Sequence, residues 1–193
     1  MFNSIFKIIY FIEFVIALII RKVYERKFIK LDVEIQKKST IEMFFLLLNG
    51  VGMIVPIVYV FSSWLDFANY TLPSWLGWVG VILFAFAIWL LWRSHHDLGR
   101  NWTPTVAMRY EPELITCGVY RYIRHPMYSA HLIWAIAQIF ILHNWIAGYS
   151  FLIVQVPFCF IRIKNEEEMM IEQFGVTYKA YMEKTDRLIP KLI

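Results

Sequence analysis

Long apolar stretches alternate along this chain with shorter polar segments. Three of the stretches reach the roughly 17–25 residues needed to cross a hydrocarbon core of about 30 Å, and two are shorter. The stretches cover Phe2–Ile20, Met43–Ser62, Trp75–Trp92, Tyr128–Leu142 and Trp145–Ile161. The pattern predicts an all-α integral membrane protein with about five transmembrane helices.

The last two apolar stretches are separated only by His143 and Asn144. Such a short link predicts a tight hairpin of the fourth and fifth helices, with the start of one beside the end of the other. Pro126 suits the first turn of the fourth helix, where its missing N–H costs nothing. The fifth helix is expected to continue beyond its apolar part and to end at Phe174-Gly175.

The amino-acid composition of the chain agrees with a protein whose helices are surrounded by lipid. Of 193 residues, 59% are hydrophobic and 18% are aromatic, well above the roughly half-apolar content of soluble domains. Cys117 lies in a loop and Cys159 in an apolar run, so neither a disulfide framework nor a thiolate metal site is expected. Four glycines are expected to permit close packing of helices, namely Gly50, Gly52, Gly77 and Gly80.

The net charge of +4 does not indicate nucleic-acid binding, because no basic stripe with interleaved aromatic residues is present. Instead, lysines and arginines gather in alternate connections, whereas 63–74 and 143–144 carry none. The positive-inside rule then places the N-terminus outside and the C-terminus in the cytoplasm. We expect an N-terminal three-helix membrane region at 1–92. A catalytic region at 93–193 would hold the connecting loop, the hairpin and the cytoplasmic tail.

Polar residues suited to binding converge at the cytoplasmic end of the hairpin. Arg162 and Glu166 are four apart and share a face of the fifth helix. The hairpin brings them beside His125 and Tyr128, at a helix N-terminus that favours a carboxylate or phosphate. A pocket at the cytoplasmic membrane surface follows from this convergence.

These residues form a pattern that resembles a known family. Gly118-Val119-Tyr120, the run Arg124–Tyr128, a helical hairpin, then Arg162 and Glu166-Glu167 are similar to the isoprenylcysteine carboxyl methyltransferases. The resemblance extends over about Leu98–Pro190. It implies an S-adenosylmethionine-dependent enzyme that methylates the carboxylate of a prenylated cysteine in the lipid bilayer and releases S-adenosylhomocysteine.

The resemblance also implies roles for particular residues. Arg162 would hold the acceptor carboxylate. The residues implied for the cofactor are Leu114, Ile115, Tyr120, His125, Pro126, Tyr128 and Glu166. The glycine-rich dinucleotide fingerprint is absent, so a Rossmann-type cofactor site is not expected. Methylation of an ionised carboxylate needs positioning and exclusion of water rather than a general base.

Other interpretations stay open. Arg162 and Glu166 are also compatible with a plain surface ion pair, and His125 with a helix start that binds nothing. His95-His96-Asp97 does not predict a metal site, since adjacent histidines on a helix diverge. Alternative functions are methyl transfer to a phospholipid amine or another lipophile, a membrane reductase with a nicotinamide cofactor, and a non-catalytic scaffold.

Overall fold

The computed structural model describes residues 2–28, 33–36, 40–102, 107–109 and 112–190. All five apolar stretches are helical, as predicted. The helices are α1 (Phe2–Phe28), α2 (Thr40–Phe61), α3 (Ser74–Leu98), α4 (Pro126–Leu142) and α5 (Trp145–Phe174). A shorter helix, α6 (Val176–Lys184), follows. Single 3₁₀ turns lie at Asp66–Ala68, Gly99–Asn101 and Gly118–Arg121.

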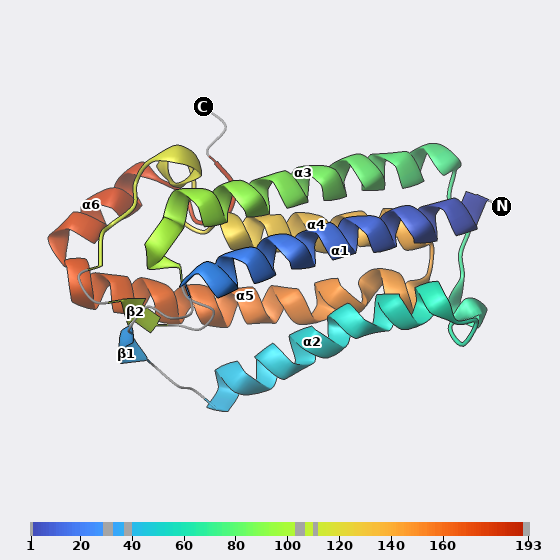
Figure 1. The fold of residues 1–193 in the computed structure, drawn as a ribbon, viewed down its shortest axis with the longest axis horizontal. Helices are drawn as coiled ribbons and strands as arrows, with labels where there is room; N and C mark the ends of the chain where they lie inside the picture. The colour runs from blue at the N-terminus through green and yellow to red at the C-terminus, as the bar shows by residue number, and fades with distance from the viewer. Residues whose placement is uncertain (1, 29–32, 37–39, 103–106, 110–111, 191–193) are drawn as a thin grey trace.

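Three of these helices are long and apolar enough to cross a membrane. The qualifying segments are Met43–Phe61, Ser74–Asn101 and Trp145–Phe174, and α4 is apolar but shorter. The long helices run side by side (Figure 1). The N-terminus, the α2–α3 connection and the α4–α5 turn lie at one end of the bundle, and α6 lies at the other.

The predicted α4–α5 hairpin is confirmed, and local chemistry explains its turn. Pro126 is in the first turn of α4, and His143 closes that helix with a left-handed backbone, at φ 48°. The Asn144 side chain then accepts hydrogen bonds from the N–H groups of Ile146 and Ala147, which satisfies the free donors at the start of α5. Two residues are therefore enough to reverse the chain.

Glycine ends both α3 and α5, and for α5 this is the end that the sequence predicts. Gly99 and Gly175 have φ of 54° and 52°, values that a residue with a β-carbon rarely adopts. Their N–H groups donate to the carbonyl oxygens of His95 and Ile171. The chain consequently turns sharply just where α3 and α5 leave the bundle.

A small β-sheet departs from the all-α prediction. β1 (Val33–Gln36) pairs antiparallel with β2 (Ala107–Arg109), and a register irregularity lies between Val33 and Ile35. Each strand has four residues or fewer, too short to show a clear alternation of polar and apolar positions. The sheet lies at the end of the bundle that carries α6 (Figure 1).

Three of the four glycines expected at helix contacts are at such contacts. Added β-carbons would collide with α5 at Gly52, with α1 at Gly77 and with α4 at Gly80. Gly50 is an exception, because nothing lies within 4 Å of the corresponding position. The expectation for Gly50 is therefore wrong.

The Gly80→Ala substitution should lower stability by about 1–3 kcal/mol, the usual cost of overpacking. Its β-carbon would lie 2.9 Å from the Ala137 carbonyl oxygen, which belongs to the backbone of α4 and cannot easily move aside. Thermal unfolding in detergent measures the change. Gly50→Ala is the matched control and should be neutral or stabilising by up to about 1 kcal/mol. Equal effects of the two substitutions would contradict the packing argument.

Candidate functional site

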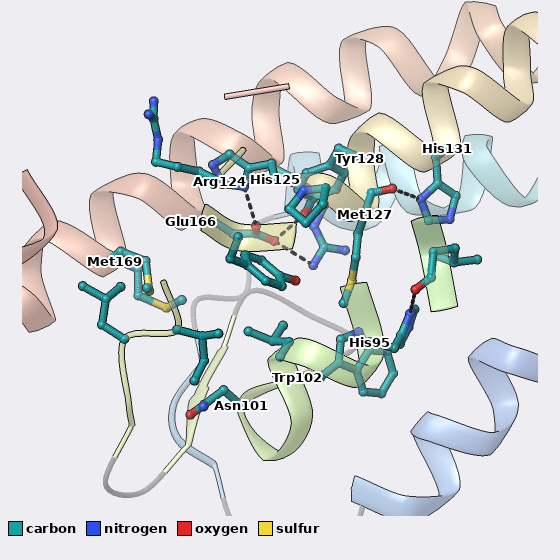
Figure 2. A pocket seen from close by; sticks show the side chains of 18 of the residues that line it. His95, Asn101, Trp102, Arg124, His125, Met127, Tyr128, His131, Glu166 and Met169 are labelled. Atoms are coloured by element: carbon teal, nitrogen blue, oxygen red, sulfur yellow. Dashed lines mark hydrogen bonds and ion pairs between the residues drawn. The ribbon is translucent and has the colours of Figure 1, made fainter. Parts of the chain in front are cut away.

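One cavity of about 230 Å³ lies where the ends of α3 and α5 meet the start of α4 and helix α6. All eight residues singled out from the sequence line it. They are Leu114, Ile115, Tyr120, His125, Pro126, Tyr128, Arg162 and Glu166. Figure 2 shows His125, Tyr128 and Glu166 close together, with Met169 on one side of them and His131 on the other. The structure brings the predicted residues together, and their individual roles stay predictions.

His125 lies between two carboxylates at the start of α4. Its Nδ1 is 3.6 Å from Glu166 Oε2, and its Nε2 is 3.4 Å from Glu167 Oε1. Burial alone would lower the pKa of His125, but hydrogen bonds to both glutamates and their negative charges outweigh it, so the pKa is raised. The charged imidazolium is thus the form that this site favours.

Glu166 faces the cavity and already has several partners. The Tyr128 hydroxyl donates to Glu166 Oε1, and Arg162 Nη2 lies 3.3 Å from the same oxygen. The Glu166 side chain is 24% exposed, and an ionised carboxylate has about four acceptor sites. Glu166 therefore retains the capacity to accept further hydrogen bonds from a ligand.

Arg162 lies one helical turn before Glu166 on the same face of α5. Its side chain is buried, and its guanidinium lies 5.4 Å from the centre of the Phe158 ring. The i,i+4 ion pair that the sequence left open is present, so Arg162 is held in place by Glu166. Because both residues also line the cavity, the ion pair is part of the site rather than a feature of the outer surface.

Glu167, to which the sequence assigned no role, is the centre of an ionic network. Its side chain is only 5% exposed. Oε1 accepts from Arg124 Nε at 3.1 Å, and Oε2 lies 2.8 Å from Arg187 Nη2. Together with the contact to His125, these interactions fix the start of α4 against α5.

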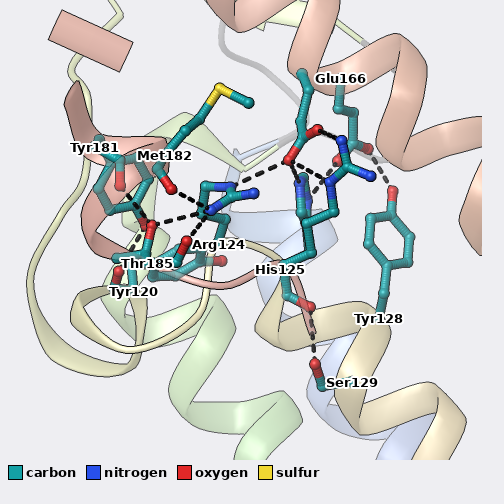
Figure 3. A network of polar contacts seen from close by, with 11 residues as sticks. Tyr120, Arg124, His125, Tyr128, Ser129, Glu166, Tyr181, Met182 and Thr185 are labelled. Carbon is teal, nitrogen blue, oxygen red and sulfur yellow. Dashed lines mark hydrogen bonds and ion pairs between the residues drawn. The ribbon is translucent and has the colours of Figure 1, made fainter. Parts of the chain in front are cut away.

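The segment 185–188 hydrogen-bonds to the chain just before and within the first turn of α4. The N–H groups of Arg124 and His125 donate to the carbonyl oxygens of Asp186 and Arg187, at 2.8 and 3.0 Å. Ser129 Oγ donates to the Leu188 carbonyl oxygen at 2.6 Å. Figure 3 shows Arg124 close to Thr185 and to Met182. Segment 185–188 therefore positions His125 through its backbone.

Asp97 has a structural role at the end of α3. It lies 3.0 Å from Arg93 Nη2 and accepts from the Val119 N–H at 2.9 Å. These contacts hold the 3₁₀ turn that carries Tyr120, whose carbonyl oxygen accepts from the Tyr181 hydroxyl at 2.6 Å. Within the described residues, no group of three potential ligands is placed to hold a metal ion.

With this geometry established, comparison with known proteins decides the family. The Isoprenylcysteine carboxyl methyltransferase (ICMT) family matches residues 78–172. A Dictyostelium discoideum protein-S-isoprenylcysteine O-methyltransferase is 30% identical over 143 residues, which make up 73% of this chain and 60% of that protein. The chain belongs to the isoprenylcysteine carboxyl methyltransferase family.

Further relatives agree with this membership. The human protein-S-isoprenylcysteine O-methyltransferase is 30% identical over 142 residues, 69% of this chain and 50% of the human protein. A solved structure of the eukaryotic intramembrane Ras methyltransferase ICMT has the same fold, with a TM-score of 0.56 at 24% identity. The structural alignment covers 82% of this chain and 55% of the solved chain. This chain therefore spans only about half to three fifths of the length of these relatives.

The part of the cavity that the sequence did not identify is mostly apolar. Lining residues outside the prediction include Trp102, Met169, Met170, Phe174 and Tyr178. Met169 lies seven residues after Arg162, so helical periodicity places both on one face and could have identified it. Trp102 carries no such signal, because it follows the 3₁₀ turn that ends α3.

Proposed function

We propose that this protein transfers a methyl group from S-adenosylmethionine to the carboxylate of a lipophilic acceptor such as a prenylated cysteine. One observation carries the proposal. Arg162 and Glu166, the residues expected to meet the acceptor and the methyl donor, line a single cavity at the end of the helical hairpin. Membership of the family supports the same reaction.

The residues around the cavity suit S-adenosylmethionine. Glu166 can accept from an amino or hydroxyl group, and the aromatic rings of Tyr178 and Phe174 offer flat apolar surface to a purine. We assign Leu114, Ile115 and Tyr120 to the same ligand. We also assign His125, Pro126 and Tyr128 to S-adenosylmethionine. When bound, S-adenosylmethionine supplies an electrophilic methyl group.

Arg162 is the residue we assign to the acceptor. A guanidinium can hold a carboxylate through two parallel N–H donors, which fixes its direction. A C-terminal carboxyl group has a pKa of about 3.3–3.7, so it is already ionised at neutral pH and needs no general base. The work of the chain is therefore alignment, together with exclusion of water by apolar side chains.

The contacts of His125 favour this reaction over methylation of a phospholipid amine. An amine nucleophile must first lose a proton, and His125 is the nearby candidate base. Both ring nitrogens of His125 already face carboxylates, Nδ1 at 3.6 Å from Glu166 and Nε2 at 3.4 Å from Glu167, so neither is directed at an acceptor. A carboxylate acceptor makes no such demand.

Calorimetry of the purified protein tests the donor. S-adenosylmethionine and S-adenosylhomocysteine should bind, and NADPH should not. The Glu166→Gln substitution should weaken S-adenosylhomocysteine binding by about 1–3 kcal/mol, or about 5–150-fold, because a charged acceptor is lost. Glu168→Gln is the matched control, since Glu168 is exposed on the same helix. Binding of NADPH alone would support a reductase instead.

We further propose five membrane spans with the cavity on the cytoplasmic side. Opposite ends of the bundle differ in charge, since the connections 63–74 and 143–144 carry no lysine or arginine. Thiol labelling in sealed vesicles tests this topology. The native exposed Cys117 should react from the cytoplasmic side. Phe67→Cys, at an exposed position of the α2–α3 connection, should react only from outside when Cys117 is replaced by serine. Labelling of position 67 from the cytoplasm would refute the arrangement.

A further inference from the structure

Arg21 is the one basic residue of α1 that lines the cavity. It is partly buried near the end of α1. Tyr24, three residues later on the same face, has its ring 5.2 Å from that of His95, which also lines the cavity. This face of α1 is thus turned toward the site. The neighbouring Lys22 instead lies at the surface and pairs with Glu25 at 2.7 Å.

No hydrogen bond or ion pair joins Arg21 to another residue in the part of the chain that the structure describes. Its charged neighbours are Arg162, a like charge, and Glu25, which already pairs with Lys22. His131, near the start of α4, lines the same cavity. A partly buried cation that faces a second cation is unfavourable unless an anion lies between them. The cavity is therefore complementary to a negatively charged group.

Position decides which anion fits. Arg162 is held by Glu166, so it offers an incoming anion less than a full positive charge. On the bilayer side the cavity is lined by Leu46, Met53 and Phe158, which suit a lipid chain. Met169 and Tyr178 lie at the opposite end, beyond Glu166. An anion that reaches both arginines along the apolar side is the head of a lipophilic acid.

We propose that Arg21 is a second guanidinium for the acceptor's carboxylate and so sets the preference of the site for an acid over a neutral lipid. This inference rests on the proposed function. It assigns part of the acceptor site to α1, which lies outside the residues 78–172 that match the family. Arg162 holds the carboxylate through its two parallel donors, and Arg21 donates to the acceptor sites that remain on the same oxygens.

The test compares two probes that differ only in charge, an N-acetyl-S-farnesylcysteine and its carboxamide. Dissociation constants for both are measured without methyl donor, together with S-adenosylhomocysteine affinity and turnover of the acid. The parent should prefer the acid. Arg21→Gln should reduce that preference at least about tenfold, as expected for loss of a charged hydrogen bond. Its affinities for the amide and for S-adenosylhomocysteine should change less than twofold.

Two further variants complete the comparison. Lys22→Gln removes the same charge from the adjacent exposed position and should behave as the parent. Arg21→Lys should retain part of the acid preference, and its unchanged amide affinity reports that the site is folded. An unchanged acid preference in Arg21→Gln, with turnover present in the parent, overturns the inference alone. Loss of S-adenosylhomocysteine affinity instead would assign Arg21 to the methyl donor. A parent that binds neither probe and methylates nothing overturns the proposed function as well.

Discussion

The Arg162→Lys substitution is expected to lower methyl transfer to a prenylcysteine about a hundredfold, the cost of a reacting group misplaced by about 1 Å. Lysine keeps the positive charge but lacks the planar fork that fixes a carboxylate in one direction. Binding of S-adenosylhomocysteine should stay close to that of the parent, because Arg162 lies about 6 Å nearer the membrane along α5 than Glu166. Turnover and cofactor titration measure the two effects separately.

Lys164 provides the control for this experiment. It is exposed on the same helix, two residues away, so Lys164→Arg exchanges the same two side-chain types outside the cavity. That variant should turn over as the parent does. If Arg162→Lys abolished cofactor binding, or left turnover intact, the acceptor role assigned to Arg162 would be wrong.

Removal of the Glu167 carboxylate should have the largest effect on stability. Glu167→Ala leaves Arg124 with a buried charge and no carboxylate, and breaking a buried ion pair in this way costs about 3–5 kcal/mol. Arg187 adds less, because its side chain is 61% exposed and is screened by water. The midpoint of thermal unfolding in detergent should fall, and methyl transfer should be lost with the position of His125.

The adjacent Glu168 is a matched control, since it is exposed and Glu168→Ala removes the same group from the same helix. It should unfold at nearly the parent temperature. Glu167→Gln, which keeps the shape and loses the charge, should be intermediate. Equal unfolding midpoints for the alanine variants at 167 and 168 would show that the ionic network adds no stability.

The helices and the hairpin were predictable because their causes are local. Apolar length defines a membrane helix, and Pro126 and Gly175 mark a start and an end whatever surrounds them. The pairing of β1 with β2 was not predictable, because it joins segments more than 70 residues apart and each is very short. Gly50 and Gly80 likewise look alike in sequence, and only the packing of α3 on α4 distinguishes them.

In the site, too, the features with local causes were predictable and those that depend on long-range packing were not. Helical spacing and the tight turn were sufficient to bring His125 together with Arg162 and Glu166. Which of the three consecutive glutamates lies deepest depends on the exact rotation of α5 against α4 and on the chain that covers it. Arg187 reaches Glu167 only because the chain folds back after α6. No periodic pattern records that return, so the ionic network was missed.

The pairing of segment 185–188 with the start of α4 has a consequence for biosynthesis. The N–H groups of Arg124 and His125 acquire their partners only when residues about 60 positions later have been made. At about 5–20 residues per second, α4 leaves the ribosome roughly 3–12 s before that segment does. During this interval the earlier helices can pack, but the N–H group of His125 lacks the partner that segment 185–188 provides. The start of α4 therefore acquires these backbone partners only after α4, α5 and α6 have been synthesised.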